Sequence, residues 1–261
     1  MIGETDGNRI AVVIAGASGK TGQAVGKAVY QAKDMKVVGA IGRRHAGEKL
    51  GFLWGDAQLS LVIAEHTDQI VQPAAVLVDF TEPTSAYPRI MDAVERGWDV
   101  VVGTTGFTAS QRNAIRDRIQ RTEVGGVLIA NFSLGAYVLE SLARYAAQYF
   151  STVEVLEGHA ATKLDRPSGT ALRMAEMLGE VLDRSPEAIP IHSLRLPGMG
   201  AHQAVVFGSA GEMITLRHDV HDRQAYVAGV LMAIRGVGKI RGRLVTEMRE
   251  LVGFKGAELT R

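Results

Sequence analysis

A histidine and a lysine stand four residues apart in a segment that could carry out proton chemistry. His159 can exchange a proton near neutral pH, and Lys163 offers a positive charge and a proton in the same predicted loop. The loop continues into a helix predicted to open at Pro167-Ser168-Gly169-Thr170. The first N–H groups of a helix have no partner within it, so those of Gly169 and Thr170 could bind a substrate carboxylate.

The spacing alone also permits ordinary structural roles for the same residues. Ser168 has the side chain of a common N-cap. Lys163 could be a surface charge, and His159 is one of seven histidines. On these residues taken by themselves, a catalytic role and a structural role both remain open.

A glycine-rich turn is the second feature with chemical meaning. Residues 16–22 read GASGKTG and lie between a predicted strand, Ile10–Ala15, and a predicted helix that runs to Tyr30. Glycines at this position allow a tight turn and let N–H groups at the helix start hold a pyrophosphate. The spacing is GxxGxxG rather than GxGxxG, so an ordinary strand-to-helix turn is the alternative. The flanking elements favour dinucleotide binding.

The end of the next strand indicates which dinucleotide binds. An NAD-specific site places a carboxylate there, whereas an arginine accommodates a 2′-phosphate. This sequence has Gly42-Arg43-Arg44 and no acid at that point. A guanidinium pairs well with a phosphate dianion, so we predict that NADPH is preferred and NADH is possible. The alternative is that both arginines are solvated loop charges.

The elements around these motifs predict an α/β protein with two domains. Strands alternate with helices up to about residue 130, which predicts a Rossmann-type, mostly parallel sheet. Beyond Asn131, two long helical stretches and four strand-like stretches follow in a different order, and three of these strands have no helix between them. This order predicts a smaller α+β domain with a mixed sheet. We place a dinucleotide-binding domain at 1–130 and a second domain at 131–240.

The composition limits the possible functions. The chain has 261 residues, of which 46% are hydrophobic and 22% charged, as in an ordinary globular protein. A net charge of +1 argues against nucleic-acid or acidic-membrane partners. The absence of cysteine excludes disulfides and thiolate metal sites, and we expect no metal. Without a signal-peptide pattern or an apolar run of about 18 residues, we expect a cytoplasmic protein.

In combination, the motifs resemble those of the 4-hydroxy-tetrahydrodipicolinate reductase family, also called dihydrodipicolinate reductases. The likeness runs in order through nearly the whole chain. Its motifs are the glycine turn, Val78-Asp79-Phe80-Thr81, Gly103-Thr104-Thr105-Gly106-Phe107, Ala130-Asn131-Phe132-Ser133, the segment from Glu157 to Ala171, Ser193-x-Arg195, His202, His218, and Arg223 with Tyr226 and Gly229. The tail from Leu244 to Leu251 also looks like the family's last segment, which returns to the nucleotide domain.

This resemblance implies an NAD(P)H-dependent oxidoreductase of lysine and diaminopimelate biosynthesis, with a small dicarboxylate substrate. It implies that 241–261 returns to the dinucleotide-binding domain and that 131–240 binds substrate and assembles a homotetramer. His159 matches the family's general acid/base, and Lys163 its substrate-contacting proton donor. The resemblance assigns substrate binding to Ser168, Gly169 and Thr170. It assigns cofactor binding to Gly16, Ala17, Ser18, Gly19, Lys20, Thr21, Arg43, Gly103, Thr104, Thr105, Ala130, Asn131, Phe132 and Ser133.

The sequence also departs from the family pattern. The family usually has a second histidine directly after the catalytic one, where this chain has Ala160. Lys20 and Thr21 replace the common Arg-Met pair, and Arg166 stands where the family favours alanine. Two alternatives therefore stay open: a reductase of a related cyclic imine or keto acid, and a non-catalytic NADPH-binding module.

Overall fold

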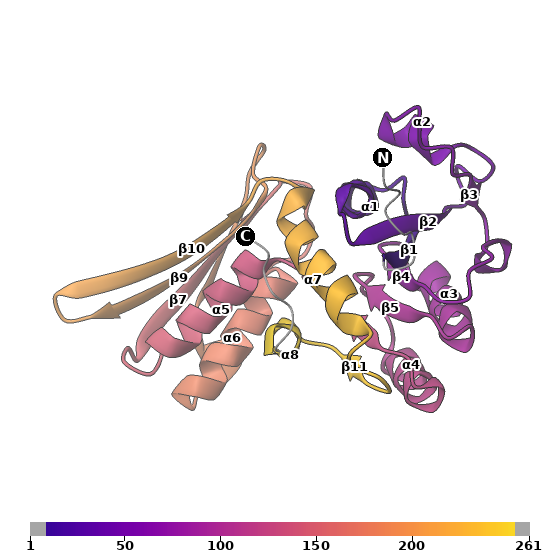
Figure 1. The fold of residues 1–261 in the computed structure, drawn as a ribbon. Coiled ribbons are helices and arrows are strands. Elements are labelled where there is room, and N and C mark those ends of the chain that lie inside the picture. Colours follow the sequence, from indigo (N-terminus) through magenta and orange to yellow (C-terminus); the bar gives the residue numbers. More distant parts are fainter. Residues whose placement is uncertain (1–8, 254–261) are drawn as a thin grey trace. The chain divides into compact units, whose positions relative to one another are not determined.

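The computed structural model describes residues 9–253 and divides into two compact units (Figure 1). Unit 1 contains residues 9–132 and 226–253, and unit 2 is Ser133–Ala225. The expected return of 241–261 to the first domain is described only as far as residue 253. Among the described residues, no helix is long and apolar enough to span a membrane.

Unit 1 is built on a seven-stranded parallel sheet with the order β11-β6-β5-β4-β1-β2-β3. The order reverses beside β1, between β1 and β4, and ligands of open α/β sheets bind outside the strand ends at such a point. The strands are β1 (Ile10–Ala15), β2 (Met35–Ile41), β3 (Ile63–Ala64), β4 (Val76–Asp79), β5 (Asp99–Val102), β6 (Gly126–Leu128) and β11 (Leu244–Val245).

Helices cover the two faces of this sheet. On one face, alternate strand residues such as Val13, Leu77 and Val100 share a core with apolar residues of α3 and α4, including Ile90. α1 and α7 pack against each other, and α7 also contacts β5. The helices are α1 (Lys20–Gln31), α2 (Leu50–Trp54), α3 (Pro83–Glu95), α4 (Ala109–Thr122), α7 (Val227–Val237) and α8 (Met248–Gly253), with 3₁₀ turns η2 (Thr67–Gln69) and η4 (Arg223–Tyr226).

The division between the units differs from the expected one at the second crossing. The first boundary, expected after residue 130, falls after Phe132. Residues 226–240, expected in the second domain, belong to unit 1 because α7 contacts α1, β5 and β6. The physical reason is burial, since α7 has an almost continuous apolar surface that includes Val230, Ile234 and Val237. Helical periodicity shows such a surface but not which sheet it covers.

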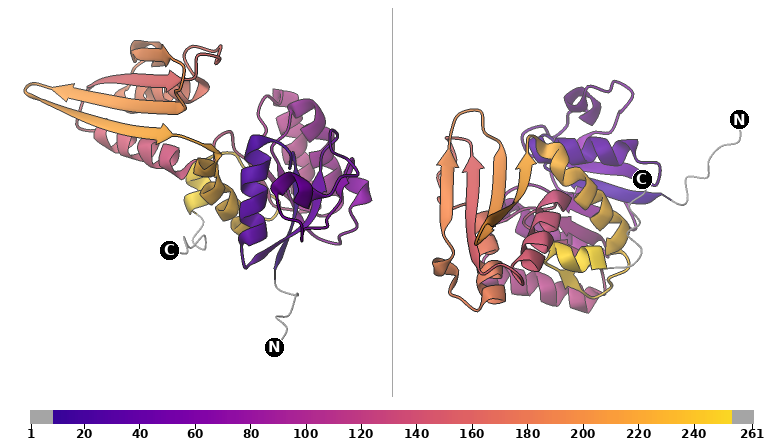
Figure 2. Two further views of the ribbon diagram at one scale, coloured as in Figure 1. Left: turned by 90° about the horizontal axis from the view of Figure 1, so that it is seen from above. Right: turned by 90° about the vertical axis from the view of Figure 1, so that its left-hand side faces the viewer.

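Unit 2 is a mixed sheet with the order β10-β9-β7-β8, in which β7 and β8 are parallel and the other pairs antiparallel. Figures 1 and 2 show α5 and α6 together on one face of it. Leu139, Ala171, Val155 and Phe207 contribute to their shared core. The elements are α5 (Leu134–Ala146), β7 (Thr152–His159), α6 (Gly169–Leu182), η3 (Pro186–Ala188), β8 (Ile191–Arg195), β9 (Ala201–Ser209) and β10 (Glu212–Val220). The parallel sheet and the smaller mixed sheet confirm the predicted fold class.

Candidate active site

The glycine turn connects β1 to α1 in unit 1. Gly16 has a φ of 81°, and its N–H donates to the Ile41 carbonyl at 3.0 Å. Gly19 is the N-cap of α1 and offers no side-chain cap, and no acidic residue stands in the first helical turn. Ser18, Gly19 and Lys20 are exposed. An uncapped helix start with exposed backbone and no negative charge fits a pyrophosphate.

Close packing explains the third glycine of the turn. A Cβ atom on Gly22 would lie 2.1 Å from the Gly16 carbonyl oxygen, so α1 can approach the turn only without a side chain here. The Trp54 indole N–H donates to the Ala17 carbonyl at 3.1 Å and ties α2 to the same turn. The turn therefore has a fixed shape that depends on glycine at position 22.

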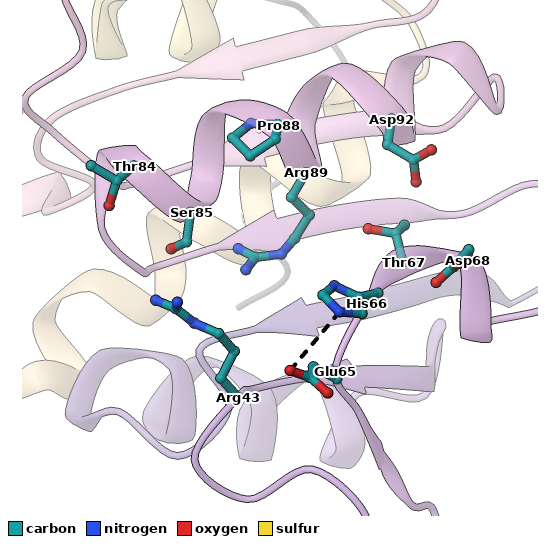
Figure 3. Close-up of a pocket in the computed structure, with 10 residues that line it drawn as sticks. All are labelled: Arg43, Glu65, His66, Thr67, Asp68, Thr84, Ser85, Pro88, Arg89 and Asp92. Carbon is teal, nitrogen blue, oxygen red and sulfur yellow. Dashed lines mark ion pairs between the residues drawn. The ribbon is translucent and has the colours of Figure 1, made fainter.

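Arg43 lines a cavity of about 520 Å³ in unit 1. Figure 3 shows the guanidiniums of Arg43 and Arg89 with the hydroxyl of Ser85 toward one side, and the carboxylates of Asp68 and Asp92 toward the other. Arg43 follows β2, and Ser85 and Arg89 belong to α3, which follows β4. This places a basic, hydroxyl-bearing end of the cavity beside strands on both sides of β1.

Asp79, at the end of β4, organises the neighbouring strand ends. Its buried carboxylate accepts hydrogen bonds from the Thr81 hydroxyl at 2.7 Å and the Thr104 hydroxyl at 2.8 Å, and pairs with Arg89 at 2.5 Å. The Thr104 hydroxyl also accepts the Thr81 N–H at 2.9 Å. The hydroxyl of Thr104, a predicted cofactor residue, is therefore engaged in hydrogen bonds within the protein. The next predicted cofactor residue, Thr105, is exposed.

The predicted cofactor segment 130–133 contains two buried residues. Phe132 is buried, and its ring lies edge-on to Phe80 with centroids 6.0 Å apart. Ser133 is the N-cap of α5 and accepts the Ala136 N–H at 3.2 Å. Ala130 is exposed. The Ser133 hydroxyl thus has a structural role that the sequence motif did not reveal.

His218 on β10 packs against the start of α5. Its Nε2 lies 3.3 Å from the Ser133 hydroxyl, and a Cβ atom on Gly135 would lie 2.4 Å from the same nitrogen. Burial lowers the pKa of His218 below its ordinary value, although the nearby Asp219 carboxylate acts in the opposite direction. The neutral imidazole is therefore the favoured form in the folded protein.

We expect the free energy of unfolding to fall as the pH drops from about 6.5, the ordinary histidine value. Below that pH the unfolded chain binds more protons at residue 218 than the folded chain does. The free energy of unfolding therefore decreases until the pH has fallen below the lowered pKa that His218 has in the folded protein. One proton sets a ceiling of about 1.4 kcal/mol per pH unit. Urea unfolding between pH 8 and 5.5 should show this slope, reduced in His218→Gln and kept in His192→Gln, a change at an exposed residue of β8. A slope in His218→Gln equal to that of the unaltered protein would contradict the assignment of this pH dependence to His218.

The predicted catalytic histidine lies at the end of β7 in unit 2. His159 is largely buried, with 15% of its side chain exposed. Its Nδ1 lies 2.5 Å from a carboxylate oxygen of Glu157, which is fully buried. Glu157 also pairs with Arg195 of β8 at 2.7 Å. The structure therefore gives His159 a carboxylate partner, which is the usual support for a proton-transferring imidazole.

Lys163 and the start of α6 follow in the same segment. The Lys163 ammonium lies 2.8 Å from the Asp165 carboxylate, and this hydrogen bond lowers the pKa of Asp165. Ser168 is buried and caps α6 by accepting the Ala171 N–H at 3.3 Å, so its hydroxyl is used within the fold. Gly169 and Thr170 are exposed at the first turn of α6. Their N–H groups remain the candidates for carboxylate binding.

Two family models match the chain one after the other. The N-terminal model of dihydrodipicolinate reductase matches residues 10–132, and the C-terminal model matches residues 135–252. The chain belongs to the dihydrodipicolinate reductase family. The predicted family and the predicted enzyme class, an NAD(P)H-dependent oxidoreductase, are thereby confirmed.

Relatives support this family over nearly full length. The 4-hydroxy-tetrahydrodipicolinate reductase of Thermosynechococcus vestitus is 38% identical over 93% of this chain and 97% of its own. The enzyme of the same name from Gloeobacter violaceus is 40% identical over 87% and 94%. A solved structure of dipicolinate-bound dihydrodipicolinate reductase from Paenisporosarcina sp. TG-14 has a TM-score of 0.80 at 32% identity, covering 93% and 99%. An amine dehydrogenase from Mycobacterium smegmatis, 14% identical with a TM-score of 0.62, shares the fold.

Sequence reasoning missed the partners of the predicted residues. Glu157 and Arg195 were part of quoted motifs without a role, and Asp79 and Arg89 had none either. One signal was available, because Glu157 and His159 are two apart on a strand and so share a face. Arg195 is 38 residues from Glu157, and only the strand pairing brings them together. Within residues 9–253, no group of three or more His, Asp or Glu side chains could hold a metal ion.

Proposed function

We propose that this protein reduces 4-hydroxy-tetrahydrodipicolinate to tetrahydrodipicolinate with NAD(P)H, in lysine and diaminopimelate biosynthesis. The observation that carries the proposal is the near-complete coverage of the chain by reductases of that name. The dipicolinate-bound relative supports a small, ring-shaped dicarboxylate as substrate. The reaction adds one hydride and one proton to the substrate and releases one water. When bound, the reduced dinucleotide supplies the hydride.

We assign the proton chemistry to residues of unit 2. His159, beside the Glu157 carboxylate, is suited to hold and release a proton. Lys163 offers a second positive charge for the dicarboxylate and a second proton. The exposed N–H groups of Gly169 and Thr170 at the start of α6 would bind a carboxylate. These groups would orient the substrate ring and stabilise its charge. Positioning and electrostatic stabilisation of this kind contribute most of the rate acceleration.

Unit 1 supplies the residues that would hold the dinucleotide. The uncapped start of α1 suits the pyrophosphate, and Arg43 in the cavity of unit 1 suits the 2′-phosphate. Gly103, Thr105, Ala130 and Asn131 are proposed for the nicotinamide half. Thr104 and Phe132 support that region from inside unit 1, because their side chains are buried. Ser133 is the first residue of unit 2 and caps α5. We also propose a cytoplasmic location for the protein.

The test is an assay with substrate made freshly from pyruvate and aspartate semialdehyde. We expect substrate-dependent oxidation of NADPH, and slower oxidation of NADH. Binding of NADPH without oxidation by this substrate would refute the proposed reaction.

Ala160 supports a second candidate within the same reaction class. The residue after His159 is half-buried and carries only a methyl group, so the site offers one hydrogen-bond donor fewer than a site with two histidines. A dicarboxylate should bind less tightly as a result. If the assay with the family's substrate fails while another cyclic imine or keto acid is reduced, this second candidate is correct.

Replacing Arg43 by methionine is expected to raise the KM for NADPH about 10- to 100-fold. A hydrogen bond to a charged group contributes about 1.5–3 kcal/mol, and NADH lacks the 2′-phosphate that would accept this bond from Arg43. The KM for NADH should change less than about threefold. Arg44→Met is the matched control, because Arg44 is exposed and does not line the cavity. Equal effects of Arg43→Met on both cofactors would contradict the phosphate assignment.

We also propose that the open face of the unit 2 sheet assembles into a homotetramer. The face opposite α5 and α6 carries apolar side chains on all four strands, among them Leu194, which is 49% exposed, and Met213, which is 76% exposed. An exposed apolar sheet face is typical of an assembly surface. Light scattering should give four times the mass of 28.0 kDa, and a monomeric mass would contradict this.

A further inference from the structure

Glu157 lies on β7 two residues before His159, so both side chains point to the same face of the strand. Its side chain is fully buried, and a buried carboxylate needs partners to stay charged. The register of β7 and β8 sets His159 opposite Arg195 on that face. The start of α6 approaches the same place, because the Ser168 N–H donates to Glu157 at 3.3 Å.

The two carboxylate oxygens of Glu157 have different partners. Oε2 lies 2.5 Å from Nδ1 of His159 and accepts from Nη1 of Arg195 at 2.8 Å. Oε1 accepts from Nη2 of Arg195 at 2.7 Å and from the Ser168 N–H. The Arg195 guanidinium is thus bound in a two-point geometry, which is the strongest form of this pair. Nη2 of Arg195 also donates to the Asp165 carbonyl at 2.6 Å, in the loop that carries Lys163.

The charges of this cluster decide which nitrogen of His159 carries a hydrogen. Burial, the largest influence, raises the pKa of Glu157, but hydrogen bonds from Arg195, Ser193 and His159 together hold it below its ordinary value. Glu157 is therefore a carboxylate and can only accept. The nitrogen facing it must donate, so Nδ1 of His159 carries a hydrogen. Nε2 is left as the atom that gains or loses a proton.

We propose that Glu157, held by Arg195, is a positioning residue that fixes His159 as the Nδ1–H tautomer, with Nε2 as the proton-transferring atom. The same Arg195 guanidinium fixes the loop of Lys163 through the Asp165 carbonyl. This inference rests on the proposed proton-transfer role of His159, and goes beyond it by naming the reactive atom and the residues that select it. A carboxylate orients a catalytic imidazole in the same way in serine proteases.

The test replaces Glu157 by glutamine, which keeps the shape but adds an N–H₂ group. Because Arg195 needs the amide oxygen, the N–H₂ group would face His159 and favour a bare Nδ1 with hydrogen on Nε2. Glu154→Gln is the matched control: Glu154 stands on the same strand and bonds His192 of β8 at 2.8 Å, but is about half exposed.

Nitrogen-15 NMR of the histidine rings in the full chain gives the direct readout. The His159 signal is assigned by its loss in His159→Asn, and spectra are taken at high pH, where the ring is neutral. We expect the Nδ1–H tautomer in the unaltered protein and in Glu154→Gln, and the Nε2–H tautomer in Glu157→Gln. An Nε2–H tautomer in the unaltered protein would overturn the inference even if Glu157→Gln failed to fold. So would an unchanged Nδ1–H tautomer in a folded Glu157→Gln.

Kinetics supply the second readout. In Glu157→Gln we expect kcat to fall about 10²-fold or more, as when an amide replaces the carboxylate of a catalytic histidine, with the KM for NADPH within about twofold of normal. Glu154→Gln should keep its kcat. A kcat loss no larger than that of Glu154→Gln would overturn the inference. If the unaltered protein reduces no tested substrate, the proposed function fails, whereas the NMR result still decides the tautomer.

Discussion

His159→Ala is expected to lower kcat by about 10²- to 10⁴-fold, the usual contribution of a positioned general acid. The affinity for NADPH should stay within about twofold, because the residues proposed to hold the dinucleotide belong to unit 1. The change removes the imidazole from Glu157 and leaves a buried carboxylate that Arg195 and Ser168 still satisfy. Folding should therefore survive, and circular dichroism with a melting curve checks this.

Two substitutions of Lys163 separate its charge from its proton. Lys163 is the only lysine of unit 2, so no other lysine of that unit can take over either role. Lys163→Ala should also lower kcat by about 10²-fold or more. Lys163→Arg keeps the positive charge but does not give up a proton near neutral pH. If Lys163 donates the proton, the arginine variant should bind dipicolinate normally and turn over as slowly as the alanine variant.

Single-turnover kinetics and titration with NADPH separate these outcomes. His192→Ala serves as the control, since His192 is an exposed histidine of the same sheet. Normal turnover in His159→Ala would show that this histidine does not carry the proton. Loss of NADPH binding in either the His159 or the Lys163 variant would contradict the proton-transfer role proposed for that residue.

Gly22→Ala is expected to damage the dinucleotide site through backbone contact. The new Cβ atom would lie 2.1 Å from the Gly16 carbonyl oxygen and 2.7 Å from its carbon, and backbone atoms cannot rotate away as a side chain can. Either α1 or the turn must move. Overpacking of this kind costs about 1–3 kcal/mol, which corresponds to a fall in Tm of about 3–10 °C for a protein of this size.

The movement of α1 also displaces the N–H groups proposed to bind the pyrophosphate. We therefore expect NADPH to raise the Tm of the unaltered protein clearly and that of Gly22→Ala little, because stabilisation by a ligand depends on its affinity. Gly236→Ala is the control. Gly236 is a buried helical glycine of unit 1, and a Cβ atom added there would lie 3.8 Å from its nearest neighbour outside the helix backbone. A normal NADPH-induced shift in Gly22→Ala would refute the role given to this turn.

The sequence was most informative where function depends on local order along the chain. The turn at Gly16–Gly22 could be read because a buried strand, glycines and a helix follow one another directly. The motif around His159 and Lys163 is likewise one continuous segment. The parallel sheet followed from the alternation of strands and helices, and the mixed sheet from strands without a helix between them.

What the sequence did not reveal depends on contacts between distant residues. The Glu157–Arg195 pair forms only when β8 lies beside β7. The hydroxyls of Ser133 and Ser168 each cap a helix start. The sequence offered this role for Ser168 as an alternative, and the same N-cap preference could have identified it for Ser133. Residues 226–240, which include α7, were expected in the second domain but belong to unit 1, because an apolar helix does not identify the sheet that it packs against.

Calorimetric titration with NADPH, followed by dipicolinate, gives the sharpest test of dinucleotide binding at the glycine turn. We expect that one NADPH binds per chain, that dipicolinate then binds to the complex, and that Gly22→Ala loses the binding of NADPH while His159→Ala keeps it. If the unaltered protein takes up neither NADPH nor NADH, the glycine turn holds no dinucleotide and the proposed reduction cannot occur.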